Sequence, residues 1–243
     1  MSPSSESAVM SGYEARWQQH NAERRVQILR AAVEVIESSP VGADISVQSI
    51  ARRAGVAKSV VYRQFSGKDE LERRIRSHLV DDFVAVLENQ LDISTGSLRE
   101  ILTRSVLAVA DWMADHQRLN DFARRGPTLD GARDGSDELK RRIAARGAAI
   151  IASVAEAIGV SSDAFESVPF VVVTMVDATL ASWLSESPPA RTRDQMAAAL
   201  ADIIWFILDG TARSIGVVID PDAEFATMVD GLEPAAGPTA PRG

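Results

Sequence analysis

The sequence of 243 residues contains no cysteine and only three histidines. Disulfide frameworks and thiolate metal sites are therefore excluded, and the chain suits a reducing compartment such as the cytoplasm. No uninterrupted apolar run approaches the roughly 18 residues that span a membrane, and the polar, acidic first residues do not resemble a signal peptide. We expect a cytoplasmic protein without a membrane partner.

Motifs of catalysis are missing as well: there is no glycine-rich phosphate loop, no nucleophile elbow and no pair of catalytic carboxylates. His78, Asp81 and Asp82 have the i, i+3, i+4 spacing of metal ligands. The two aspartates fit a solvated helix face better, and no further ligand set accompanies them. We therefore expect neither an enzyme nor a bound metal or cofactor.

Charge is unevenly distributed along the chain, although the net charge is -8. Residues 14–78 carry 12 Lys and Arg against 8 Asp and Glu, whereas residues 79–243 carry 14 against 25. A basic N-terminal third joined to an acidic remainder indicates a polyanionic partner for one end only.

Apolar residues recur at helical spacing through most of the chain, and clusters of Gly, Pro and Ser separate the segments. These patterns predict an all-α fold of about nine helices. A strand at 171–173 is the alternative for one segment, but no partner strand is predicted. The predicted helices span about 23–39, 47–54, 57–65, 68–91, 98–115, 118–125, 136–158, 168–186 and 193–217.

The segment 45–71, ISVQSIARRAGVAKSVVYRQFSGKDEL, predicts two short helices joined at Gly55, which permits a tight reversal. Its apolar residues would pack the corner between these helices. The residues left for the outer surface are Gln48, Lys58, Ser59, Tyr62 and Arg63. A polar, basic surface with one aromatic hydroxyl suits phosphates and base edges in a major groove, although each side chain taken alone fits an ordinary solvated face.

The run IARRAGVAKSVVYRQFSGKDEL resembles the DNA-binding signature of the tetracycline-repressor (TetR) family, and the resemblance covers residues 24–75. It implies an all-helical homodimer whose third helix reads the major groove and whose C-terminal domain binds a small ligand and dimerises. It places Lys58, Ser59, Tyr62 and Arg63 on the recognition helix or its entry, and makes Tyr62 and Lys68 phosphate contacts. It also places Ser46, Val47 and Gln48 at the N-terminal end of the supporting helix, where free N–H groups face a phosphate.

Two positions depart from the family's pattern. Ala57 stands where a serine is common, which removes a helix N-cap usually worth about 1 kcal/mol. Ser59 replaces a common glycine and adds a hydroxyl on the surface expected to face DNA. Neither change removes the basic or phosphate-contacting groups.

The domain organisation follows from the resemblance together with the polar start of the chain, which lacks apolar periodicity, and its end, which is rich in Pro, Ala and Gly. We expect an N-terminal leader or arm at 1–22, a helix-turn-helix DNA-binding domain at 23–70, a helical ligand-binding and dimerisation domain at 71–218, and a disordered tail at 219–243.

Small residues on the last two helices predict the dimer interface, with ordinary core packing as the alternative. The predicted interface residues are Thr174, Ala178, Ala181, Ser185, Ala198, Ala201, Trp205 and Ala212. Apolar and aromatic residues with a few polar groups are typical of a ligand pocket, although most such residues in any helical protein belong to the core. The predicted ligand-binding residues are Trp112, Met113, His116, Phe122, Phe170, Met175, Thr179 and Trp183.

The predicted function is a ligand-responsive transcriptional regulator, a repressor by default, that binds a pseudo-palindromic double-stranded operator as a homodimer. A small, largely hydrophobic effector of unknown identity would release it. The alternative is a helical sensor or adaptor that has lost operator binding.

Overall fold

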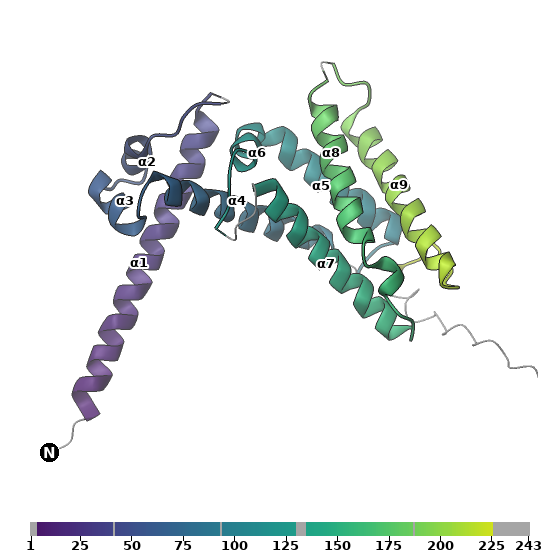
Figure 1. The fold of residues 1–243 in the computed structure, drawn as a ribbon, viewed down its shortest axis with the longest axis horizontal. Coiled ribbons are helices and arrows are strands. Elements are labelled where there is room, and N and C mark those ends of the chain that lie inside the picture. Colours follow the sequence, from purple (N-terminus) through teal and green to yellow (C-terminus); the bar gives the residue numbers. More distant parts are fainter. Residues whose placement is uncertain (1–3, 41, 93, 130–134, 187, 226–243) are drawn as a thin grey trace, which may run out of the picture. The chain divides into compact units, whose positions relative to one another are not determined.

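The structure of the protein is a computed structural model, and it describes residues 4–40, 42–92, 94–129, 135–186 and 188–225. In these residues the chain forms nine α-helices and one short 3-10 helix, with no β-sheet, which confirms the predicted all-α fold (Figure 1). The helices are α1 (Ser4–Ser38), α2 (Val47–Arg53), α3 (Lys58–Gln64), α4 (Lys68–Gln90), α5 (Leu98–Asp115), α6 (Gln117–Arg124), α7 (Gly135–Ala157), α8 (Val168–Leu184) and α9 (Arg193–Ser214), with the 3-10 helix η1 (Asp163–Phe165) before α8.

Backbone contacts divide the chain into two compact units. Unit 1 comprises residues 1–80 and 116–135, and unit 2 comprises residues 81–115 and 136–243. Helix α4 is continuous and contributes its first half to unit 1 and its second half to unit 2. Unit 1 therefore includes α6, which lies beyond the boundary at residue 71 expected from the sequence.

In unit 1, α1 packs against α2, α3 and α6. Ile28, Ala32 and Ile36 recur at i, i+4 and i+8 and are buried, so a single face of α1 forms the centre of this unit. The helix begins at Ser4, much earlier than the sequence pattern indicated. Its first turns contain no proline, so no residue stops the helix from extending backwards from Glu23.

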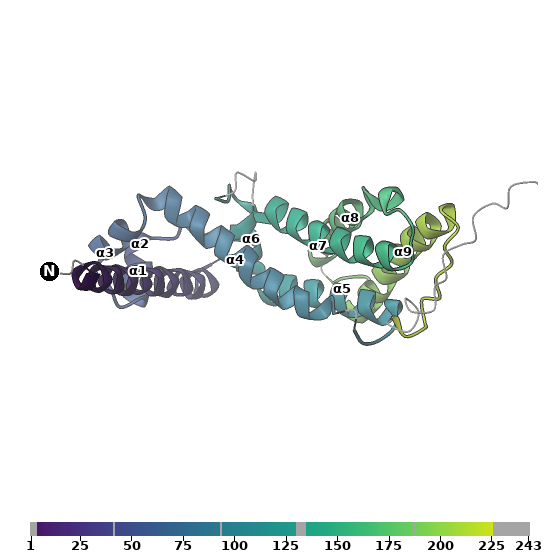
Figure 2. The ribbon, with the colours of Figure 1, turned by 90° about the horizontal axis from the view of Figure 1, so that it is seen from below.

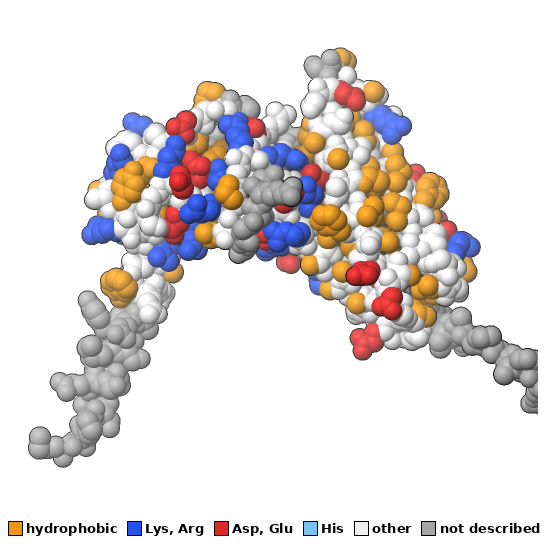
Figure 3. Space-filling model, viewed as in Figure 1, with side chains coloured by type: hydrophobic (Ala, Val, Ile, Leu, Met, Phe, Trp, Pro, Cys, Tyr) orange, Lys and Arg blue, Asp and Glu red, His pale blue; other side chains and the backbone are white. Residues whose placement is uncertain are grey.

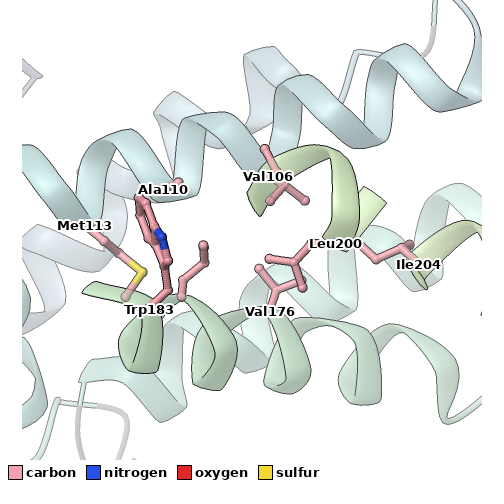
Figure 4. Packing of buried hydrophobic residues seen from close by; sticks show 9 residues of the cluster. Val106, Ala110, Met113, Val176, Trp183, Leu200 and Ile204 are labelled. Atoms are coloured by element: carbon pink, nitrogen blue, oxygen red, sulfur yellow. The ribbon is translucent and has the colours of Figure 1, made fainter. Parts of the chain in front are cut away.

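In unit 2, α5 packs against both α8 and α9, and α8 and α9 lie side by side (Figures 1 and 2). Their facing sides form one apolar cluster, shown in Figure 4. Its buried members are Val106, Ala110 and Met113 from α5, Val176, Leu180 and Trp183 from α8, and Ala197, Leu200 and Ile204 from α9. The cluster holds the three helices together.

The segment that follows α9 is ordered as far as Phe225, contrary to the expected disordered tail. Phe225 is buried, and its N–H donates to the carbonyl of Gly96 at 3.0 Å. Arg99 donates from its Nε to Asp222 at 2.8 Å, and its backbone N–H donates to Pro221. Burial of one aromatic ring and these hydrogen bonds account for the order, whereas residues 226–243 of the predicted tail lie outside the described residues.

Two stretches, Asp163–Leu184 and Arg193–Ser214, are long and apolar enough to span a membrane. Core helices of soluble proteins pass the same test. One side of both α8 and α9 lies in the apolar cluster of unit 2, and 22% of the most apolar part of the first stretch and 33% of that of the second are buried in the structure.

Candidate DNA-binding site

Helices α2 and α3 form a compact corner in unit 1. Ser46 is the N-cap of α2, and its hydroxyl accepts a hydrogen bond from the Ser49 N–H at 3.0 Å. After α2 the chain reverses at Gly55, whose φ of 65° lies in the left-handed region that favours glycine. Ala54 beside it is buried, which lets the two helices approach closely.

The apolar side of this corner is buried, as the sequence predicted. Ile50 and Ala51 of α2, Val61 of α3 and Phe65 after it are almost fully covered. With one side fixed in this way, the opposite side of the seven-residue α3 must face outward.

The outward side of α3 carries Lys58, Ser59, Tyr62 and Arg63, all of them exposed. Tyr62 has 48% of its surface accessible, and the Lys58 ammonium lies 5.7 Å from the centre of its ring. A cation over an aromatic face is attracted to it, so the two side chains form one cationic, hydroxyl-bearing patch. Guanidinium, ammonium and hydroxyl groups are the donors that contact phosphates and base edges in DNA.

The residues of α2 that were predicted to contact DNA differ in their exposure to solvent. Gln48 is exposed, whereas the Val47 side chain is buried. Val47 can therefore offer only its backbone N–H to a phosphate at the helix end.

The N-terminus of α3 lacks a side-chain cap. Ala57 occupies the N-cap position, and no side-chain hydrogen bond closes this end. The sequence predicted this difference from α2, because alanine has no hydrogen-bonding group.

Polar residues of α1 hold the corner in place, and sequence analysis missed them. Arg25 donates to the Gln64 side-chain oxygen at 3.2 Å, and the Gln64 amide donates to Asn21 at 3.1 Å. Gln27 donates to the carbonyl of Ala54, in the turn between α2 and α3, at 2.8 Å. These contacts fix the C-terminal end of α3 and the turn between α2 and α3 against α1. The sequence feature that could have revealed these residues is the run of polar side chains just before Ile28, on the same helix as the buried residues that follow.

Lys68, predicted to contact a phosphate, is the first residue of α4 and is already paired. Its ammonium lies 2.5 Å from an Asp44 carboxylate oxygen and 3.8 Å from Glu72. The hydrogen bond to Asp44 is the main cause that raises the pKa of Lys68 above its usual value. Lys68 is therefore a full positive charge in the protein, held by a neighbouring carboxylate.

The eight predicted ligand-binding residues do not form a single group. Met113 and Trp183 are buried in the apolar cluster of unit 2, and Trp112 and Met175 pack against it. Thr179 is half-buried on α8, while Phe170 is exposed. His116 and Phe122 belong to unit 1, where His116 Nδ1 lies 2.7 Å from Glu37 and the Phe122 ring lies 4.8 Å from the Arg76 guanidinium.

The predicted dimer residues of α8 and α9 differ in exposure. On α8, Ala178 and Ser185 are exposed, and Thr174 and Ala181 are half-buried. At 100° per residue these four share a side with Phe170 and Val171, two exposed apolar residues that sequence analysis did not assign to an interface. On α9, Ala198 is exposed, but Ala201, Trp205 and Ala212 are buried within the subunit itself.

The side of α9 that faces away from the buried Ala201, Trp205 and Ala212 carries two large exposed apolar residues. Ile203 is 43% exposed and Phe206 is 68% exposed. In Figure 3 hydrophobic side chains gather over α8 and α9. We call Phe170 and Val171 of α8 together with Ile203 and Phe206 of α9 the apolar face of unit 2.

Comparison with known proteins relates the helix-turn-helix segment to those of transcriptional regulators. The sequence profile described as "Bacterial regulatory proteins, tetR family" matches residues 28–75. Two curated relatives, each named an uncharacterized HTH-type transcriptional regulator of Mycobacterium tuberculosis, are 25% identical over 211 residues, covering 84% of this chain and 86% of the relative.

Solved structures share the fold. A TetR-like transcriptional regulator from Rhodococcus sp. RHA1 is 24% identical with a TM-score of 0.52, covering 77% of this chain and 96% of that chain. A tetR-family regulator from Streptomyces coelicolor is 21% identical with a TM-score of 0.61, covering 89% of this chain and 92% of that chain. The helix-turn-helix segment of the chain thus matches the tetR family profile, and its fold is similar to those of TetR-like regulators of known structure.

Proposed function

We propose that the protein is a cytoplasmic repressor that binds a pseudo-palindromic DNA operator as a homodimer and is released by a small, largely hydrophobic effector. The observation that carries this proposal is the outward side of α3, where Lys58, Ser59, Tyr62 and Arg63 are all exposed. Their supporting residues are buried or hydrogen-bonded to α1, so this patch is presented by a fixed corner.

Homodimerisation is supported by the apolar face of unit 2. Exposed phenylalanine and isoleucine side chains on adjacent helices are typical of surfaces that become covered by a partner. A two-fold symmetric contact would pair this face with itself. Such a dimer presents two copies of α3, and binding to successive major grooves requires them to be about 34 to 36 Å apart.

The effector would bind at the margin of the apolar cluster of unit 2. Trp112 and Met175 lie at the margin of the apolar cluster, and the Trp112 ring lies 4.6 Å from the Phe83 ring between centroids. Partly buried apolar side chains of this kind suit a hydrophobic ligand. Since α4 runs continuously through both units, it offers a covalent route by which a ligand in unit 2 would alter the spacing of the two α3 helices. A coupling of about 1 to 3 kcal/mol is enough for a useful switch.

In vitro selection of bound duplexes from a random pool tests the proposal directly. We expect the full chain to enrich a sequence with two inverted half-sites, with an affinity that falls steeply as salt is raised. Enrichment of no sequence would favour the alternative, a helical sensor or adaptor without operator binding. A thermal-shift screen of apolar small molecules then tests the effector, because a ligand of the native state raises the melting temperature.

A further inference from the structure

The start of α4 is crowded with opposite charges. Lys68, Asp69 and Glu70 occupy its first turn. Glu70 pairs with a near neighbour in the sequence, because its carboxylate accepts hydrogen bonds from both the N–H and the hydroxyl of Ser66. Lys68 instead reaches back 24 residues along the chain to Asp44, at 2.5 Å.

The Lys68–Asp44 pair is open to solvent. The Asp44 side chain is 82% exposed and the Lys68 side chain is 40% exposed. Asp44 also stands two residues before Ser46, the N-cap of α2, so it lies beside the helix end whose N–H groups would face a phosphate. A phosphate that approaches Lys68 therefore meets the Asp44 carboxylate at the same ammonium.

We propose that Asp44 competes with the DNA backbone for Lys68, so that a phosphate must displace this carboxylate when the protein binds a duplex. This inference rests on the proposed function. Asp44 and a phosphate oxygen offer the ammonium the same kind of charge-assisted hydrogen bond. Because phosphates are common to all sequences, the competition weakens binding to every duplex by a similar factor and leaves base recognition by α3 unchanged.

The size of the effect follows from the exposure of the pair. Exposed ion pairs are weak, so freeing Lys68 should tighten DNA binding by about two- to fivefold. A freed ammonium also releases one more counterion from DNA, so the slope of log affinity against log salt should steepen by up to about 0.9.

The experiment compares the full-length protein with Asp44→Asn, Lys68→Ala and the double variant, each on a random-sequence duplex and on a selected duplex over a series of NaCl concentrations. Asp69→Asn is the matched control, because Asp69 lies next to Lys68 on the same turn and acts on it through charge alone, without the hydrogen bond. We expect Asp44→Asn to tighten binding to both duplexes by about two- to fivefold, Asp69→Asn to have a smaller effect, and Asp44→Asn to change nothing in the Lys68→Ala background.

Three results would overturn the inference. Weaker binding by Asp44→Asn would make Asp44 a residue that positions Lys68 for DNA. Equal tightening in the Lys68→Ala background, or by Asp69→Asn, would reduce the effect to general repulsion between carboxylates and phosphates. The inference would also be wrong if Asp44→Asn has the melting temperature of the wild type and binds both duplexes with the same affinity as a wild-type protein that does bind DNA. If the wild-type protein binds no duplex even at low salt, the proposed function itself fails.

Discussion

The two units of this protein differ in what the outward sides of their helices expose. Unit 1 exposes a polar, cationic side of α3, whereas buried charged side chains occur in both units, Arg76 in unit 1 and Glu138 in unit 2. Unit 2 has an entirely apolar central cluster and also carries large apolar side chains on its surface. A polar surface suits a partner that is bound and released, whereas an exposed apolar face suits a partner that remains bound.

The apolar face of unit 2 gives the largest expected effect. Phe206→Glu would place a charge on each side of a two-fold interface, where like charges oppose one another at a cost of several kcal/mol. We expect the dimer Kd to rise on the order of a thousandfold, with operator affinity falling as the two copies of α3 separate. Analytical ultracentrifugation over a concentration series measures the first effect.

Ala198→Glu is the matched control for this prediction. Ala198 belongs to the stripe that the sequence assigned to the interface, and it is exposed on the same helix two turns before Phe206, about 80° from it around the axis. If the dimer persists with Phe206→Glu but dissociates with Ala198→Glu, the interface is formed by the stripe predicted from the sequence and not by the apolar face of unit 2.

The buried charge of unit 1 gives the next largest effect. Arg76 donates to the Glu72 carboxylate at 2.9 Å and to the carbonyl oxygens of Phe122 and Pro127 at 3.4 Å, so it joins α4 to α6 and the segment that follows α6. Arg76→Met removes one partner of a largely buried pair, and we expect a loss of about 3 kcal/mol in the free energy of unfolding, measured by urea denaturation. Hydrogen exchange should increase within residues 117–128.

The double variant Glu72→Leu with Arg76→Met tests whether the lost stability comes from leaving the Glu72 carboxylate without its partner. Replacing both charges with apolar groups of similar size is often neutral, so the double variant should regain at least half of the lost stability. A single variant as stable as the wild type would show that the buried charge contributes nothing to unit 1.

Substitution on the polar, outward side of α3 gives the third largest expected effect. Tyr62→Ala should weaken binding to the selected operator and to other duplexes alike by roughly 10- to 100-fold, because a hydrogen bond to a charged phosphate is worth about 1.5 to 3 kcal/mol. Tyr62→Phe separates the hydroxyl from the ring and should show most of the same loss. Titration of labelled duplexes measures both. Unchanged affinity with an intact dimer would remove Tyr62 from the interface.

Features that depend on neighbouring residues were predictable from the sequence. The helix-turn-helix is one, because Gly55 and the alternation of buried and exposed residues around it are local signals. The strand alternative at 171–173 is resolved in favour of helix α8. The early start of α1 escaped prediction, because a polar segment without apolar periodicity resembles a loop.

Features that depend on distant residues were not predictable. The helical pattern of α9 is apolar on two sides, so the sequence does not indicate which side meets the core, and the buried Ala201, Trp205 and Ala212 were assigned to an interface. The contact between Arg76 and Phe122 joins residues 46 positions apart, and nothing near either residue signals it. The ion pair of Lys68 likewise depends on Asp44, which lies 24 residues earlier in the sequence.

The smallest expected effect concerns the rigidity of the polar face itself. Helix α2 is capped by the Ser46 side chain, whereas α3 has no side-chain cap at Ala57. The stability contributed by an N-cap can therefore be compared between two neighbouring helices. Ser46→Ala should lower the free energy of unfolding by about 1 kcal/mol, and Ala57→Ser should raise it by about 0.5 to 1 kcal/mol, both by chemical denaturation. If the free α3 is frayed at its uncapped end, Ala57→Ser should also tighten operator binding, because less helix has to be ordered on the DNA. Added stability without tighter binding would mean that α3 is already fully formed before it meets DNA, held by Gln64 and its partners on α1.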